Sequence, residues 1–88
     1  MYTKIAALRK MKKLSQEELA QAVGVTRQTI TSVEVGKYVA SLPLAYKIAS
    51  YFGCKIEDVF DFSGIEQELR ARLKELERHD ALEELEFR

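Results

Sequence analysis

The chain has 88 residues, of which 47% are hydrophobic and 32% charged, with four glycines and one proline. This composition predicts one small, mainly helical globular unit with a modest core, and it argues against a disordered chain. No apolar run is long enough for a membrane span and no signal-peptide core precedes the charged residues, so a cytoplasmic location is expected. One cysteine and one histidine offer no basis for a metal site, and no cofactor is expected.

The formal net charge is zero, but the charges are unevenly divided along the chain. Residues 1–62 contain nine Lys and Arg against six Asp and Glu, whereas residues 63–88 contain five against eight. This division predicts a mildly basic domain over 1–62 and an acidic extension over 63–88. A mildly basic domain can bind polyanions where its charges cluster.

The first half of the chain shows three helical patterns. A first helix is expected over about 3–13, with Ile5 and Leu8 facing inward and Met11 as a further candidate. Ser15 and Glu18 form a capping-box pattern, which predicts a second helix from Gln16. Its apolar face is Leu19, Ala20 and Val23, and Gly24 ends it. Thr26 then caps a third helix that runs from Arg27 to about Val35, with Ile30 and Val33 inward.

Two further helices complete the expected domain. Ser41 caps a fourth helix with Pro43 in its first turn, where the missing N–H costs nothing. The residues expected on its buried face are Leu44, Ile48, Tyr51 and Phe52, and Gly53 closes it. A short fifth helix is expected over about 56–60, with Val59 and Phe60 packing inward. The predicted class is therefore all-α.

The second and third helices, with the turn between them, resemble the helix-turn-helix of the phage-repressor (Cro- or XRE-like) family. Ala20, Gly24, Ile30 and Val33 lie at the family's spacing from Gln16, and the resemblance extends over about 5–60. It implies a five-helix DNA-binding domain of a transcriptional regulator.

The resemblance also implies roles for individual residues. Gln16 would donate to a DNA phosphate from a helix N-terminus, and Arg27, Gln28 and Ser32 would face bases in the major groove. Thr26 would approach a thymine methyl group or the backbone. The chemistry agrees, because Arg pairs bidentately with guanine and Gln with adenine. Gln16 could in addition hold Gln28 in place.

Other residues near the motif are candidates for supporting roles. Further phosphate contacts are expected from a hydroxyl group and from lysines close to the motif, namely Thr31, Lys10, Lys12, Lys13 and Lys37. The resemblance implies a partly buried ion pair between Arg9 and Glu34, which would join the first helix to the end of the third.

Val35 and Ala40 depart from the family pattern. The family often has a phosphate-donating Asn where this chain has Val35, and a Pro where it has Ala40. Backbone N–H groups of Gly36 and Lys37 could replace the lost donor. Alternatively, Val35, Tyr38 and Val39 could form an apolar strip for a protein partner.

The extension carries an amphipathic pattern. Ser63 and Glu66 form a second capping-box pattern, which predicts a helix from Gly64. Its apolar stripe is Ile65, Leu69, Leu73 and Leu76, and charged pairs such as Glu66–Arg70 and Glu68–Arg72 occupy its solvated side. Leu82 and Leu85 would fall on the other side, so a break near His79–Asp80 is favoured, giving helices over about 64–78 and 81–86. One continuous helix with two contact faces is the alternative.

Such a stripe must be buried somewhere. Self-association through Ile65, Leu69, Leu73 and Leu76 is favoured over packing back on the domain, and it would give a homodimer on a palindromic double-stranded operator. No catalytic constellation is present, so an enzyme is not expected. Two alternatives stay open: an antitoxin-type module whose tail binds a partner protein, or an engineered dimer of the same domain.

Overall fold

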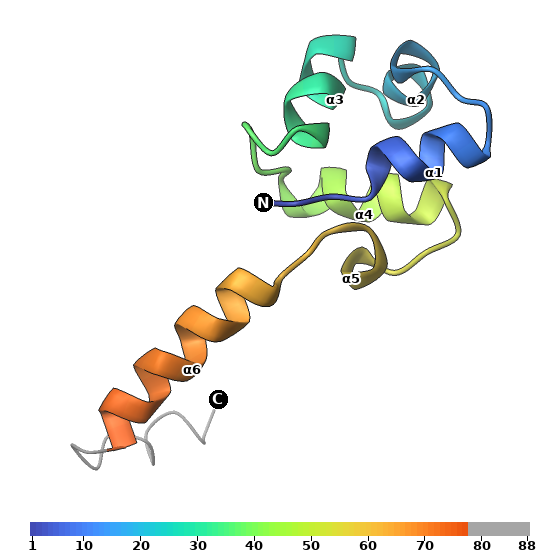
Figure 1. Cartoon of the computed structure of the whole chain (residues 1–88). Coiled ribbons are helices and arrows are strands. Elements are labelled where there is room, and N and C mark those ends of the chain that lie inside the picture. Colours follow the sequence, from blue (N-terminus) through green and yellow to red (C-terminus); the bar gives the residue numbers. More distant parts are fainter. Residues whose placement is uncertain (78–88) are drawn as a thin grey trace.

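The computed structural model describes residues 1–77, which form six helices. They are α1 (Ile5–Met11), α2 (Gln16–Val23), α3 (Arg27–Glu34), α4 (Leu42–Tyr51), α5 (Ile56–Val59) and α6 (Ser63–Glu77). Helices α1 to α5 gather into one body, and α6 projects from it (Figure 1). Over these residues the only β-type pairing is an isolated bridge, so the predicted all-α class is confirmed.

The side chains that begin and end α2 and α3 explain the positions of these helices. The Ser15 hydroxyl accepts from the Glu18 N–H, and the Glu18 carboxylate accepts from the Ser15 N–H, each at 3.0 Å. Gly24 ends α2 in the left-handed conformation with φ of 76°. The Thr26 hydroxyl accepts from the Thr29 N–H at 3.2 Å and so caps α3. The capping pattern read from the sequence is therefore confirmed at both helices.

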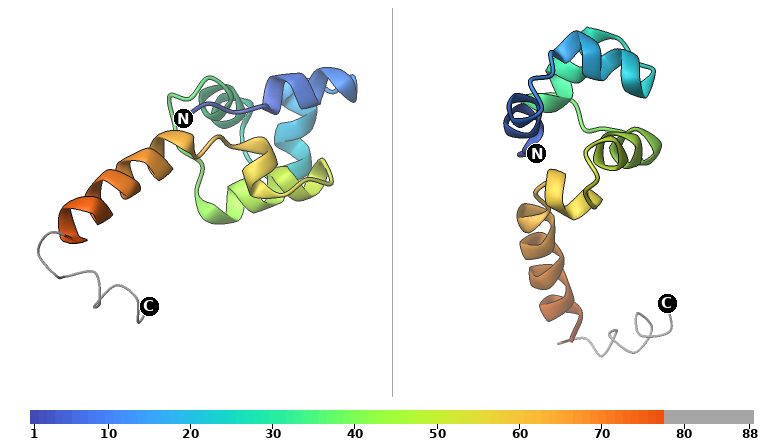
Figure 2. Two further views of the ribbon diagram at one scale, coloured as in Figure 1. Left: turned by 60° about the horizontal axis from the view of Figure 1, so that its bottom comes forward. Right: turned by 90° about the vertical axis from the view of Figure 1, so that its right-hand side faces the viewer.

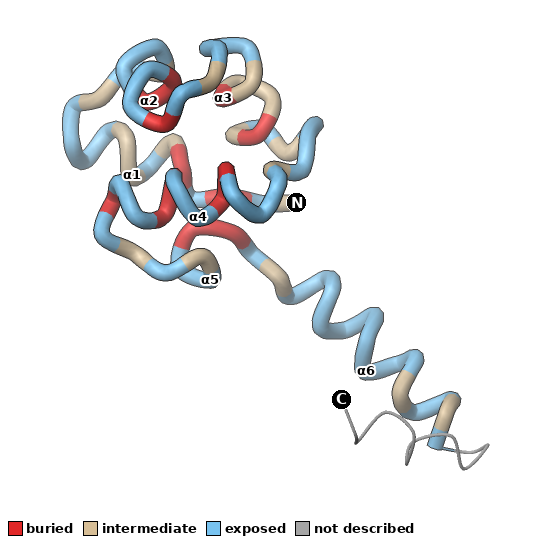
Figure 3. Tube along the Cα trace, turned by 180° about the vertical axis from the view of Figure 1, so that it is seen from behind, coloured by how far each residue is buried: buried red, intermediate tan, exposed pale blue. Residues whose placement is uncertain are grey.

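The core lies between the five helices of the body. Its largest fully buried side chains are Ile5, Leu19, Ile30, Val33, Ile48 and Val59, which come from all five helices. Each of them contributes about 1.5–3 kcal/mol by leaving water. Figure 3 shows that the buried segments lie within the body, on its helices and on the segments that join them, and that none lies on α6. The body therefore closes its core without the extension.

Two side chains expected in the core are exposed. Met11 is 81% exposed because the chain turns after α1, where Lys13 adopts a left-handed φ of 54° and Leu14 packs on the core instead. Tyr51 is 42% exposed, with its ring edge against Phe52 and the Lys12 ammonium 5.7 Å from its centroid. These two expectations were wrong, because helical spacing alone does not fix how far a neighbouring helix reaches.

The N-terminal segment is extended rather than helical, so α1 begins at Ile5 and not near Thr3. Thr3 forms the antiparallel bridge with Phe60, and a backbone hydrogen bond flanks it on either side, from Lys4 N to Val59 O at 2.8 Å and from Asp61 N to Tyr2 O at 2.9 Å. The Thr3 hydroxyl also donates to the Glu34 carbonyl at the end of α3, at 3.2 Å. This segment ties the end of the body to the end of α3.

Gly36, in the loop after α3, packs directly against the N-terminal backbone. It has φ of 81°, and a Cβ atom there would lie 2.7 Å from the Met1 carbonyl oxygen. Both the conformation and the close approach require glycine.

Helix α6 begins one residue earlier than expected, and its cap is different. Asp61, not Ser63, supplies the capping oxygen: its carboxylate accepts from the Ser63 N–H at 2.9 Å. This hydrogen bond, with a smaller contribution from the Lys4 charge, lowers the pKa of Asp61. The predicted Ser63–Glu66 capping box was therefore wrong, because a carboxylate two residues upstream reaches the same backbone first.

The extension leaves the body on the side away from α2 and α3, as the views in Figures 1 and 2 agree. The predicted break near residues 79–80 and the helix over 81–86 lie outside the described residues. Within residues 1–77, Arg9–Glu34 is the one salt bridge, so Glu66–Arg70 and Glu68–Arg72 are not closed ion pairs. No helix of the described part has the length and apolarity needed to span a membrane.

Candidate nucleic-acid interface

The turn between α2 and α3 brings the two helices into close contact. The Val25 N–H donates to the Ala20 carbonyl at 3.0 Å, and Ala20 is almost fully buried. A small residue there lets α3 cross close to α2. Because Ile30 and Val33 are buried, the opposite face of α3 is turned outward, and Arg27 and Gln28 on it are exposed.

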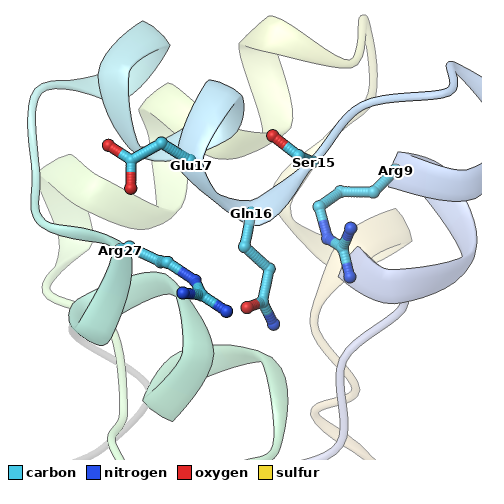
Figure 4. A pocket seen from close by; sticks show the side chains of 5 residues that line it. All are labelled: Arg9, Ser15, Gln16, Glu17 and Arg27. Carbon is cyan, nitrogen blue, oxygen red and sulfur yellow. The ribbon is translucent and has the colours of Figure 1, made fainter.

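Arg27 and Gln16 lie together at the start of α2. With Arg9, Ser15 and Glu17 they line an open depression of about 530 Å³ (Figure 4). In that view the Arg27 side chain extends from α3 towards the Gln16 amide, and Arg9 approaches from α1. Guanidinium and amide donors that converge at a helix N-terminus suit a phosphate or a base edge.

Gln16 is held by a chain of hydrogen bonds that the sequence did not predict. The Thr31 hydroxyl donates to Gln16 Oε1 at 3.0 Å, and Gln16 Nε2 donates to Glu34 Oε1 at 3.4 Å. The Arg27 carbonyl oxygen lies 3.1 Å from the same Thr31 hydroxyl and is a second acceptor for it. The expected support of Gln28 by Gln16 is therefore absent, because Gln16 turns towards Thr31 and Glu34.

Arg9 and Glu34 form a bidentate ion pair. Arg9 Nε donates to Glu34 Oε2 at 2.9 Å and Nη2 donates to Oε1 at 2.8 Å, while Nη1 donates to the Leu14 carbonyl at 3.0 Å. The two side chains are only 14% and 9% exposed. The hydrogen bonds to Glu34 raise the pKa of Arg9. This is the pair that the resemblance implied, and it joins α1 to the end of α3.

A second depression, of about 260 Å³, lies along the other side of α3. It is lined by Thr26, Gln28, Thr29, Ser32 and Tyr38. The sequence analysis assigned Tyr38 to a strip for a protein partner and missed its position beside α3. Its backbone N–H donates to the Ser32 carbonyl at 3.2 Å, a loop contact that has no sequence signal.

The candidate phosphate contacts differ in what they can offer. Lys10, Lys13 and Lys37 are exposed, whereas the Lys12 ammonium lies over the Tyr51 ring. The Gly36 and Lys37 N–H groups donate to the Val33 and Ser32 carbonyls at 3.1 and 3.0 Å. They are therefore already used inside the protein, and the idea that they replace the donor lost at Val35 is not supported.

The strip expected after α3 is exposed, with Val35, Tyr38 and Val39 at 64%, 51% and 60%. Tyr38 shares the second depression with α3, so a protein bound over the whole strip would cover part of the outward face of that helix.

A family model described as helix-turn-helix matches residues 5–59, which span α1 to α5 and include both depressions of the α2–α3 face. This chain belongs to the Cro- and XRE-like helix-turn-helix family of DNA-binding transcriptional regulators. The family assignment covers the body, and α6 lies beyond the matched residues.

Individual relatives agree with this family. An uncharacterised HTH-type transcriptional regulator of Methanocaldococcus jannaschii is 53% identical over 60 residues, which are 68% of this chain and 91% of that protein. The cryptic phage CTXphi transcriptional repressor RstR of Vibrio cholerae is 30% identical over 80 residues, which are 89% of this chain and 72% of that protein. The crystal structure of the clp gene regulator ClgR from Corynebacterium glutamicum matches with a TM-score of 0.60 at 24% identity, covering 84% of this chain and 79% of that one. That last likeness concerns the fold alone.

Proposed function

We propose that this helix-turn-helix regulator reads the major groove of a specific DNA operator through α3 and acts as a repressor. The observation that carries the proposal is the outward face of α3. Arg27 and Gln28 are exposed there, and no hydrogen bond within residues 1–77 occupies either side chain. Both are therefore free to bond base edges, Arg27 to guanine and Gln28 to adenine. The similarity to the repressor RstR supports a repressor role.

Contacts to the DNA backbone would position α3. Gln16, at the start of α2, is held by Thr31 and Glu34 in a fixed orientation for a phosphate. Lys13 and Lys37, both exposed, would add ionic contacts on either side of the motif. Ser32 and Thr26 line the second depression, where a thymine methyl group or a sugar would fit.

The proposal includes a homodimer formed through the extension. The stripe of Ile65, Leu69, Leu73 and Leu76 has no buried member, and α6 points away from the α2–α3 side. Pairing of this helix with a second copy would bury the stripe and leave both copies of α3 free for the two halves of a palindromic operator. The domain boundary at residues 62 and 63 belongs to the same proposal.

Replacing Arg27 or Gln28 by Ala should weaken specific operator binding by about 1–3 kcal/mol each, because each replacement removes a bidentate base contact. Fluorescence anisotropy with the operator and with a scrambled duplex would measure it. Thermal unfolding should be unchanged, since both side chains are exposed. Gln67→Ala is a matched control on α6. Unaltered affinity in both variants would contradict the proposed reading face.

Selection of bound sequences from a random DNA pool tests the whole proposal. A palindromic consensus is expected, with half-sites separated by about one helical turn. A consensus without symmetry would remove the homodimer, and a pool without enrichment would contradict specific DNA binding.

A further inference from the structure

The apolar stripe of α6 continues into a depression on the body. This depression, the base groove, has a volume of about 380 Å³ and lies where the N-terminal segment and the loop after α3 meet the start of α6. Tyr2, Val39 and Ile65 supply its apolar lining and are 68%, 60% and 51% exposed, and Asp61 and Glu68 also line it. The base groove therefore suits an occupant with apolar side chains and an adjacent cation.

The second half of α6 offers apolar side chains with an adjacent cation. Leu73 and Leu76 lie on its stripe, and Arg72 lies beside them. At about 100° per residue, Glu68 and Arg72 fall on one flank of the stripe, and Glu66 and Arg70 fall on the other. Each flank thus begins with an acid followed, four residues later, by a base. Further along α6, Glu75 adds a second acid to the first flank and Glu77 adds one to the second.

From the base groove and this charge pattern, we infer that two copies pair through antiparallel α6 helices centred on Leu69. The inference rests on the homodimer in the proposed function and adds its orientation. Leu69 then faces Leu69 of the second copy, and Ile65 faces the partner's Leu73. The partner's Leu76 runs back towards the body and reaches the base groove.

The flanking charges favour this orientation. In an antiparallel pair each flank meets the same flank of the second copy, so Glu66 lies near the partner's Arg70 and Glu68 near the partner's Arg72. The twofold axis repeats both contacts. A parallel pair instead brings opposite flanks together, which leaves Glu66 without a cation of the second copy in register and leaves the base groove empty. None of these carboxylates forms a salt bridge within residues 1–77, so all are available.

Disulfide cross-linking measures the orientation directly, because a disulfide needs Cα atoms within about 7 Å. On a Cys54→Ser background, Leu69→Cys should form a cross-linked dimer. Ile65→Cys and Leu73→Cys should each stay uncross-linked alone and should cross-link when mixed. Ala71→Cys, on the opposite face of α6, is the control. Efficient self-cross-linking of both Ile65→Cys and Leu73→Cys would overturn the antiparallel arrangement and leave the homodimer standing.

Charge reversal gives a second measurement that needs no cysteine. Arg72→Glu should raise the dimer dissociation constant about tenfold, because it sets two acids together. Adding Glu68→Arg should restore it, and Lys74→Glu, on the outer face, should leave it unchanged. No loss with Arg72→Glu would contradict the predicted contact. A wild-type chain that sediments as a monomer at micromolar concentration would overturn this inference and the homodimer together, whereas operator binding by such a monomer would leave the reading face intact.

Discussion

At the scale of single residues, the proposed DNA-binding surface depends on side chains that are positioned by hydrogen bonds from other residues of the protein. Thr31 was expected to contact a phosphate, but its hydroxyl donates to Gln16 at 3.0 Å. Gln16 in turn donates to Glu34, and Glu34 is fixed by the two donors of Arg9. We therefore interpret Thr31 as a residue that positions Gln16. The Arg9–Glu34 ion pair fixes the other end of this series of hydrogen bonds.

Thr31→Val keeps the shape of the side chain and removes only the hydroxyl, so it should weaken operator binding by about 1 kcal/mol with little change in melting temperature. Gln16→Ala should cost as much or more, and the double variant should cost no more than Gln16→Ala alone, since Thr31 acts through Gln16. Anisotropy titrations of the four proteins complete the cycle. Additive losses would mean that Thr31 contacts DNA on its own.

At the scale of helices, the sequence predicted those features that are decided locally. The caps at Ser15 and Thr26 and the turn at Gly24 involve residues within four positions of one another, so their spacing is enough to identify them. Met11, Tyr51 and Ser63 were misread because a neighbouring segment decided their environment. The position of Tyr38 beside α3 and the turn of Gln16 towards Thr31 also depend on tertiary contacts, which no local pattern records.

The capping box of α2 makes stability depend on pH. Hydrogen bonds from Ser15 lower the pKa of Glu18, so the ionised form contributes stability that is present above the unfolded-state pKa and is lost as the pH falls through the folded-state value. Glu18→Gln can keep the capping hydrogen bond without titrating. The advantage of the wild type over this variant should therefore shrink below about pH 4. Urea unfolding of both proteins between about pH 3 and 7, a range that includes the titration of carboxyl groups, would measure this difference in unfolding free energy. A constant difference would refute the contribution of Glu18.

At the scale of the whole molecule, we expect the body to bind DNA and the extension to form the dimer. Among residues 1–77, every buried residue lies between positions 3 and 60, and α6 contributes none. We therefore expect the body to fold without α6, and we expect the apolar stripe of the extension to pack against a second copy.

A chain ending at Phe62 should fold, with a melting temperature within about 5 °C of the full chain, because it loses no core side chain. Its affinity for a full palindrome should fall towards that for a half-site, since two linked copies bind more tightly than one. Circular dichroism and anisotropy check the two parts separately. An unfolded fragment would show that α6 belongs to the folding unit.

The N-terminal segment has a consequence for the geometry of the proposed dimer. Thr3 pairs with Phe60, three residues before α6 begins, and its hydroxyl holds the last carbonyl of α3. The N-terminal segment thus connects the start of α6 to the end of α3. Removing the N-terminal segment should leave the α2–α3 motif folded but free the angle between α3 and α6. In the proposed dimer, the shortened protein should therefore tolerate operators whose half-sites are spaced too widely or too narrowly for the full-length protein.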